Sequence, residues 1–135
     1  MSKKVFKFED FFTKTRNESA SKMPLLMDNV DTGCYFMVKG MEARSVARQR
    51  LNAQVAYAAL AEEAESIADK ANKIEFDRLG TESIQIELAK TLIVGWSFHA
   101  ECDDDGISKI LEENQGLSSH VIAHAMTSEK YFAKK

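Results

Sequence analysis

The sequence predicts a mainly α-helical fold with a long central helix, several shorter helices and a small N-terminal β-hairpin. Residues 42–79 contain neither glycine nor proline and are rich in alanine, which is typical of a helix interior. Before them, two short apolar runs flank turn-forming residues, a pattern that predicts a hairpin. The 135 residues, 44% hydrophobic and 29% charged, suffice for a single domain with its own core. Within it we expect an N-terminal arm over 1–22, the hairpin over 23–40 and a helical body over 41–135.

The predicted hairpin has two apolar strands joined by a polar turn. The apolar runs are Leu25–Met27 and Cys34–Val38, and Asp28–Gly33 between them is rich in residues that favour turns. Pro24, the single proline of the chain, suits an edge strand because it cannot donate a backbone hydrogen bond. A lone hairpin is marginally stable in water, so this one should pack on helices or pair with another copy.

The long helix carries a heptad seam, in which apolar residues recur every seven positions. The first row of this seam consists of Val46, Ala53, Leu60, Ile67 and Ile74. A second row contains two alanines, whose small side chains allow another helix to come close. Gly80 then predicts the end of the helix. An unbroken helix would measure about 54 Å, whereas a compact domain of this size has a radius of gyration of about 14 Å. The helix therefore either bends within the domain or projects beyond it, and a projecting seam would need a second chain to cover it.

Three further helices are predicted, at about residues 81–98, 107–113 and 119–126. In the first, Ile84, Leu88, Leu92 and Trp96 lie four residues apart, and further apolar residues widen the face. Such a wide apolar face indicates deep burial. Leu88, Leu92 and Trp96 are therefore assigned to the structural core.

Two groups of residues are candidates for contacts with partner chains. The N-terminal arm holds several phenylalanines, which either fold back onto the core or dock on a partner. Three arginines near the start of the long helix precede a group of acidic residues between Glu62 and Asp69. These charges either keep the surface soluble or bring the basic end against an acidic surface, such as that of a neighbouring copy. The predicted partner or self-association interface comprises Phe8, Phe11, Phe12, Arg44, Arg48, Arg50, Leu60, Ile67 and Ile74.

The segment Glu101–Gly106 partly matches a calcium-binding loop. With Glu112 it places acidic residues at the first, third, fifth and twelfth positions and glycine at the sixth. Ser108 and Lys109 break the pattern, because they put a polar residue and a positive charge at the eighth and ninth positions. The favoured interpretation is an acidic turn that caps the next helix.

Histidine and cysteine spacings raise the alternative of a zinc site. The candidate ligands form two short-range pairs, His99 with Cys102 and His120 with His124. The two pairs would have to meet by folding, and neither belongs to a recognised zinc spacing. Surface or half-buried histidines are the favoured interpretation, so neither a metal nor another cofactor is predicted.

Other function classes lack their usual sequence signals. The chain has no nucleophile elbow, no phosphate-binding glycine loop and no dinucleotide motif, so we expect no enzyme. A net charge of −3 disfavours nucleic acid and anionic membranes as partners. The longest apolar stretch is too short to span a bilayer, and no long apolar run follows the basic N-terminus. Two cysteines far apart in sequence suit a reducing compartment, so we expect a cytoplasmic protein.

The order of motifs along nearly the whole chain resembles the tail assembly chaperones of long-tailed bacteriophages. Asp10–Phe12 leads a short N-terminal segment, and a hairpin that ends in Tyr35–Gly40 leads into a long alanine-rich helix. The segment Leu92–Phe98, the most distinctive of these motifs, is followed by an acidic turn, a short helix and a terminal Phe132.

The resemblance implies a protein of the host cell cytoplasm that helps to build the phage tail and is absent from the mature virion. Its partners would be the tape measure protein, the tail tube protein and other copies of itself. Many such chaperones also exist in a longer form made by ribosomal frameshifting, and Ala133–Lys135 is compatible with a slippery adenine run. The alternatives are a metal-binding regulatory protein and another phage structural adaptor, such as a head–tail connector component.

Overall fold

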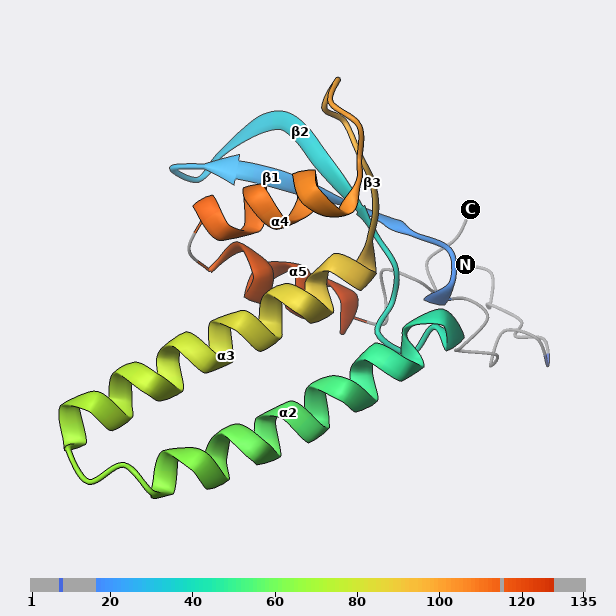
Figure 1. Ribbon diagram of the computed structural model, residues 1–135. Coiled ribbons are helices and arrows are strands. Elements are labelled where there is room, and N and C mark those ends of the chain that lie inside the picture. The colour runs from blue at the N-terminus through green and yellow to red at the C-terminus, as the bar shows by residue number, and fades with distance from the viewer. Residues whose placement is uncertain (1–7, 9–16, 115, 128–135) are drawn as a thin grey trace, which may run out of the picture.

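The computed structural model describes residue 8, residues 17–114 and residues 116–127 (Figure 1). These residues form mainly α-helix together with a small three-stranded antiparallel sheet, in agreement with the predicted class. Phe6, Phe11 and Phe12 of the N-terminal arm, and Phe132 at the other end, lie outside the described residues. The elements are β1 (Ser21–Met27), β2 (Val30–Val38), the 3₁₀ turn η2 (Arg44–Val46), α2 (Ala47–Glu65), α3 (Lys70–Leu92), β3 (Ile93–Trp96), α4 (Asp104–Glu113) and α5 (Leu117–Ala125).

The β-hairpin of β1 and β2 has a tighter turn than the sequence predicted. The ladder pairs Met27 with Val30, so the turn consists of Asp28 and Asn29, whose φ angles are 52° and 67°. Two successive residues with positive φ match the twist of the flanking strands, and Asp and Asn tolerate this region best after glycine. The segment 30–33, which was predicted as turn, therefore belongs to β2.

The long helix predicted over 42–79 is only roughly matched, because the chain reverses at residues 66–69 and forms two helices. Asp69 caps α3 by accepting a hydrogen bond from the backbone N–H of Ala71, at 3.1 Å. Figure 1 shows α2 and α3 side by side as a helical hairpin whose turn lies far from the sheet.

Gly80 lies inside α3 and does not end a helix. A Cβ atom at this position would lie 2.4 Å from Cδ1 of Leu60 on α2. The glycine therefore lets the two helices approach each other closely, and packing outweighs its low helix propensity.

The first half of the heptad seam is covered within the chain. Val46, Ala53, Leu60 and Ala64 are buried, and α2 packs along α3. Ile74, in contrast, is 61% exposed. Of the two alternatives, the chain bends within the domain, and α3 folds back onto α2 and covers this part of the seam.

The predicted helix over 81–98 is wrong beyond Leu92, where the chain becomes a strand. β3 pairs with β2 in antiparallel orientation, with Trp96 opposite Phe36. The segment Ile93–Trp96 combines β-branched residues with an aromatic residue, the types that suit strands. Leu88 and Leu92 are buried, and Trp96 is half-buried against the core.

The core lies where the sheet meets α3, α4 and α5. Its largest fully buried side chains are Phe36, Val38, Val46, Leu92, Leu111 and Val121.

The acidic turn before α4 caps this helix, which is the role that the sequence analysis favoured over a calcium loop. Asp103 accepts a hydrogen bond from the N–H of Gly106 at 2.8 Å. Two further aspartates lie in the first turn of α4, where their negative charges interact favourably with the helix dipole.

Polar contacts tie the start of the described chain to the linker before α2. The carboxylate of Glu18 accepts hydrogen bonds from the N–H and the hydroxyl of Ser45, both at 2.8 Å, and lies 3.1 Å from Nζ of Lys39. The hydrogen bonds from Ser45, assisted by Lys39, lower the pKa of Glu18 from 4.5 to about 2. Beside this cluster the side chain of Asn17 is buried and accepts a hydrogen bond from the N–H of Glu42.

Candidate binding groove

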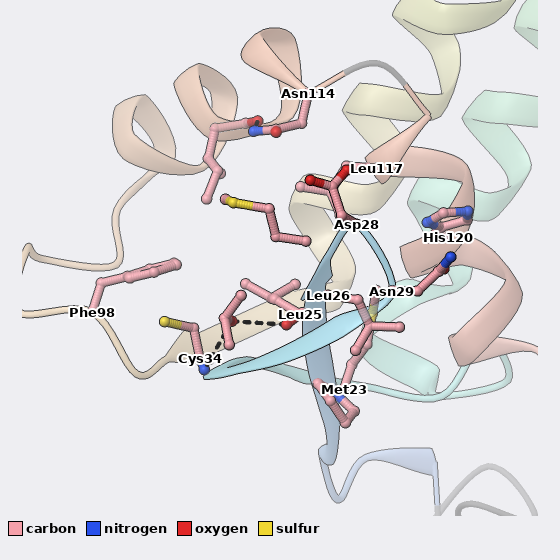
Figure 2. Close-up of a pocket in the computed structure, with 14 residues that line it drawn as sticks. Met23, Leu25, Leu26, Asp28, Asn29, Cys34, Phe98, Asn114, Leu117 and His120 are labelled. Atoms are coloured by element: carbon pink, nitrogen blue, oxygen red, sulfur yellow. Dashed lines mark hydrogen bonds between the residues drawn. The ribbon is translucent and has the colours of Figure 1, made fainter.

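The candidate site is an apolar groove between the β-hairpin and the helices α4 and α5. Its volume is about 610 Å³, within the range of pockets that bind ligands or side chains of a partner. Figure 2 shows side chains of β1, α4 and α5 around it. The groove is lined by Met23, Pro24, Leu25, Leu26, Met27, Asp28, Asn29, Thr32, Cys34, Phe98, Ile110, Asn114, Leu117 and His120.

An irregularity in the hairpin shapes one wall of the groove. Between the pairs Pro24–Tyr35 and Leu26–Asp31 the register shifts, so that Leu25 faces three residues of β2. Gly33 adopts a φ of 83° at this point, a value that glycine reaches without strain. The hydroxyl of Thr32 donates a hydrogen bond to the carbonyl of Leu25 at 2.8 Å. The bulge therefore bends the hairpin while its backbone groups remain bonded.

An aromatic cluster holds a further residue of the lining, Phe98, in the loop after β3. Phe98 lines the groove, and its ring centroid lies 5.3 Å from that of Trp96 and 6.5 Å from that of Phe36. The indole N–H of Trp96 donates to the carbonyl of Ala100 at 2.8 Å, which holds the loop after β3. These edge-to-face contacts fix Phe98 in place.

The chemistry of the groove favours apolar contact over catalysis. Most of its lining residues are apolar, among them two methionines on β1, and the polar groups lie in the turn, on β2, at the C-terminal end of α4 and on α5. Methionine is flexible and polarizable, so it adapts to side chains of different shape. Leu26 and Met27 are 61% and 69% exposed. Such an exposed apolar surface is typical of an interaction site.

The described members of the predicted interface differ in exposure. Arg44 and Arg48 are exposed, whereas Arg50 is half-buried and donates to the carbonyl of Met41. Leu60 is buried against α3 and has no free face for a partner. The remaining described members are Phe8, at 78% exposed the most open, Ile67, which is half-buried, and Ile74, which is exposed.

The alternative zinc site is not assembled in the described part of the chain. No group of three or more histidine, cysteine, aspartate or glutamate side chains converges there in a way that could hold a metal ion. His124 instead lies 3.2 Å from the hydroxyl of Ser21, and His120 lines the groove. Burial, with the charge of Asp103, raises the pKa of the Cys102 thiol, which opposes formation of the thiolate that binds metals.

Sequence reasoning missed the groove, although one signal for it was present. Leu25, Leu26 and Met27 are consecutive apolar residues, whereas a strand with one solvent face should alternate. The excess of apolar residues beside the turn indicates a second apolar contact. The opposite wall gave no comparable signal, because it forms only when α4 and α5 fold back onto the hairpin.

Comparison with known protein families, with curated proteins and with solved structures found no match. Among the helices that the structure describes, none combines the length and the apolar character needed to cross a membrane. The groove and the exposed surfaces are therefore the basis for assigning a function.

Proposed function

We propose that this protein is a phage tail assembly chaperone that holds apolar helical segments of the tape measure protein in the groove between β1, α4 and α5. The observation that carries the proposal is the open, methionine-containing apolar groove of about 610 Å³. The order of motifs that resembles tail assembly chaperones supplies the identity of the partner.

A long helical partner presents its apolar side chains at intervals of three and four residues. A groove of this size accepts a few such side chains at a time, which is how amphipathic helices bind in apolar grooves. Successive segments of a very long chain differ in sequence, so a chaperone needs an adaptable surface. The exposed Met27 beside Leu26 meets this need because methionine repacks easily. Recruitment of tail tube subunits, through a longer frameshifted form, belongs to the same proposal, as does a non-enzymatic role in the host cytoplasm.

The proposal can be tested by measuring how synthetic amphipathic peptides from the tape measure protein bind to this protein. Fluorescence anisotropy of the labelled peptides gives the affinity. Leu26→Glu should weaken binding at least about tenfold, since a buried charge opposes apolar docking. Val30→Glu is the matched control, because Val30 is 64% exposed at the same end of the hairpin but does not line the groove. Equal effects of both variants, or no binding by the parent protein, would refute this site.

Gene order gives an independent test of the partner. A gene placed between those for the tail tube and a very long tape measure protein would support the proposal. A position among head–tail connector genes would contradict it and would favour the structural adaptor instead.

A further inference from the structure

The side of α2 that points away from α3 carries an ordered row of exposed residues. Arg48, Val55 and Glu62 are spaced by seven residues, or two helical turns, which places them in one row. Leu51 and Ala58 lie in the turns between them at the same spacing. All five are exposed, with Leu51 at 58% and Val55 at 62%. We call these five residues the outer face of α2.

The outer face is apolar in the middle, basic at its N-terminal end and acidic at its C-terminal end. A few exposed charges elsewhere on the helices form ion pairs, such as Arg78 with Glu75 at 2.7 Å. Within the described residues, neither Arg48 nor Glu62 has such a partner. Two opposite charges that flank an apolar centre are therefore both available to another molecule.

The spacing of these residues is self-complementary. Val55 lies seven residues from Arg48 and seven residues from Glu62. If a second α2 is laid against the first in antiparallel orientation with Val55 on Val55, each Arg48 faces a Glu62 of the other copy. Leu51 then lies against the turn that holds the small side chain of Ala58, which allows close approach. In a parallel arrangement with the same centre, like charges would face each other at both ends.

We propose that the outer face of α2 binds the outer face of a second copy around a two-fold axis at Val55. Such an isologous contact uses one surface twice, and the end charges select the antiparallel orientation. The surface is a single helix face, smaller than a standard interface of about 1,600 Å². We therefore expect a dimer that dissociates at low protein concentration and in high salt.

The dimer would also serve the proposed chaperone function. This role of the dimer, unlike the pairing itself, rests on that proposed function. No residue of α2 lines the groove, so pairing through α2 leaves both grooves open. One dimer could then hold a long partner at two points, which raises the overall affinity without new contacts.

Sedimentation equilibrium of the purified protein at high micromolar concentration and low salt tests the pairing. The parent protein should dimerise, and Arg48→Glu and Glu62→Arg should each raise the dissociation constant about tenfold or more, because like charges then meet. The double variant should dimerise again, since its exchanged charges face each other once more. An equimolar mixture of the two single variants should form a heterodimer for the same reason.

The matched control is Lys109→Glu, which makes the same charge change at an exposed position of α4 and should leave association unchanged. A monomeric parent protein, an Arg48→Glu effect no larger than that of the control, or a folded double variant that stays monomeric would each overturn the proposal. Peptide binding separates the two proposals: Leu26→Glu should lose peptide but keep the dimer, whereas Arg48→Glu should lose the dimer but keep binding at a single groove.

Discussion

The body of the molecule and the helical hairpin differ in how their residues are buried. The body, formed by the sheet, α4, α5 and the end of α3, contains the fully buried Phe36, Leu92 and Leu111. In the helical hairpin, the whole stretch from Glu65 to Glu87 contains no buried residue. Leu60 and Ala64 are buried but lie outside the main core cluster.

This difference indicates that the two regions respond differently to mutation. Regions with few buried contacts open locally at lower free energy than the core. The body should therefore determine whether the chain folds, and the helical hairpin should open without unfolding the body. A projecting element of this kind leaves one face of α2 free for other chains.

The largest expected effect comes from the body. Phe36→Ala should lower the free energy of unfolding by about 3–5 kcal/mol, a large part of the roughly 5–15 kcal/mol typical of such domains. Phe36 is 0% exposed and contacts the ring of Trp96 at a centroid distance of 6.2 Å. Trp96 is the single tryptophan, so denaturant unfolding followed by its fluorescence measures the stability of the body.

Phe36→Leu serves as the control, because it keeps much of the side-chain volume. It should cost less than half as much as the alanine variant. A loss below about 1 kcal/mol in Phe36→Ala, the size of an average point mutation, would mean that the body is not the stabilising region.

The sequence predicted those features that depend on neighbouring residues. The hairpin, the acidic turn that caps α4 and the mainly helical class all follow from local turn, capping and periodicity signals. The break in the long helix also had a local signal, since Asp69 is a good N-cap residue, but the continuous heptad seam outweighed it in the prediction. A heptad seam indicates that a helix packs against another helix. It does not indicate whether that second helix belongs to the same chain.

Other features depend on residues that meet only after folding. Gly80 was read as a helix end, although its role depends on Leu60, which lies 20 residues earlier in the chain. β3 forms because β2 offers it an edge, and this tertiary contact overrode the helical spacing of Leu88, Leu92 and Trp96. The groove has one wall from the hairpin and one from α4 and α5, so neither segment alone reveals it.

A smaller effect is expected for the packing inside the helical hairpin. Leu60→Ala should lower the free energy of unfolding by about 2 kcal/mol, the low end for buried leucine, because this side chain lies outside the main core. Hydrogen exchange should accelerate at the amides of residues 66–80 and remain unchanged in β2.

Leu51→Ala is the matched control on the same helix. Leu51 is 58% exposed, so the change in stability should stay within about 0.5 kcal/mol in dilute protein. If the amides of β2 exchanged together with those of the helical hairpin in Leu60→Ala, the two regions would form one cooperative unit and the contrast between them would be wrong.

The smallest expected effect concerns the junction of the two regions, where Glu18 holds the linker before α2. Its pKa is about 2 in the folded protein against an ordinary value of 4.5, so the unfolded chain binds a proton more readily than the folded chain does. The stabilisation is therefore fully present above pH 4.5 and is lost as the pH falls toward 2. Because the Glu18 side chain is 36% exposed, solvent screening should limit the effect of Glu18→Gln near neutral pH to about 0.2–1 kcal/mol. Thermal unfolding of both proteins between pH 2 and pH 7 should show their difference shrinking with acidity. A Glu18→Gln difference that is constant over this range would mean that the charge of Glu18 does not stabilise the junction.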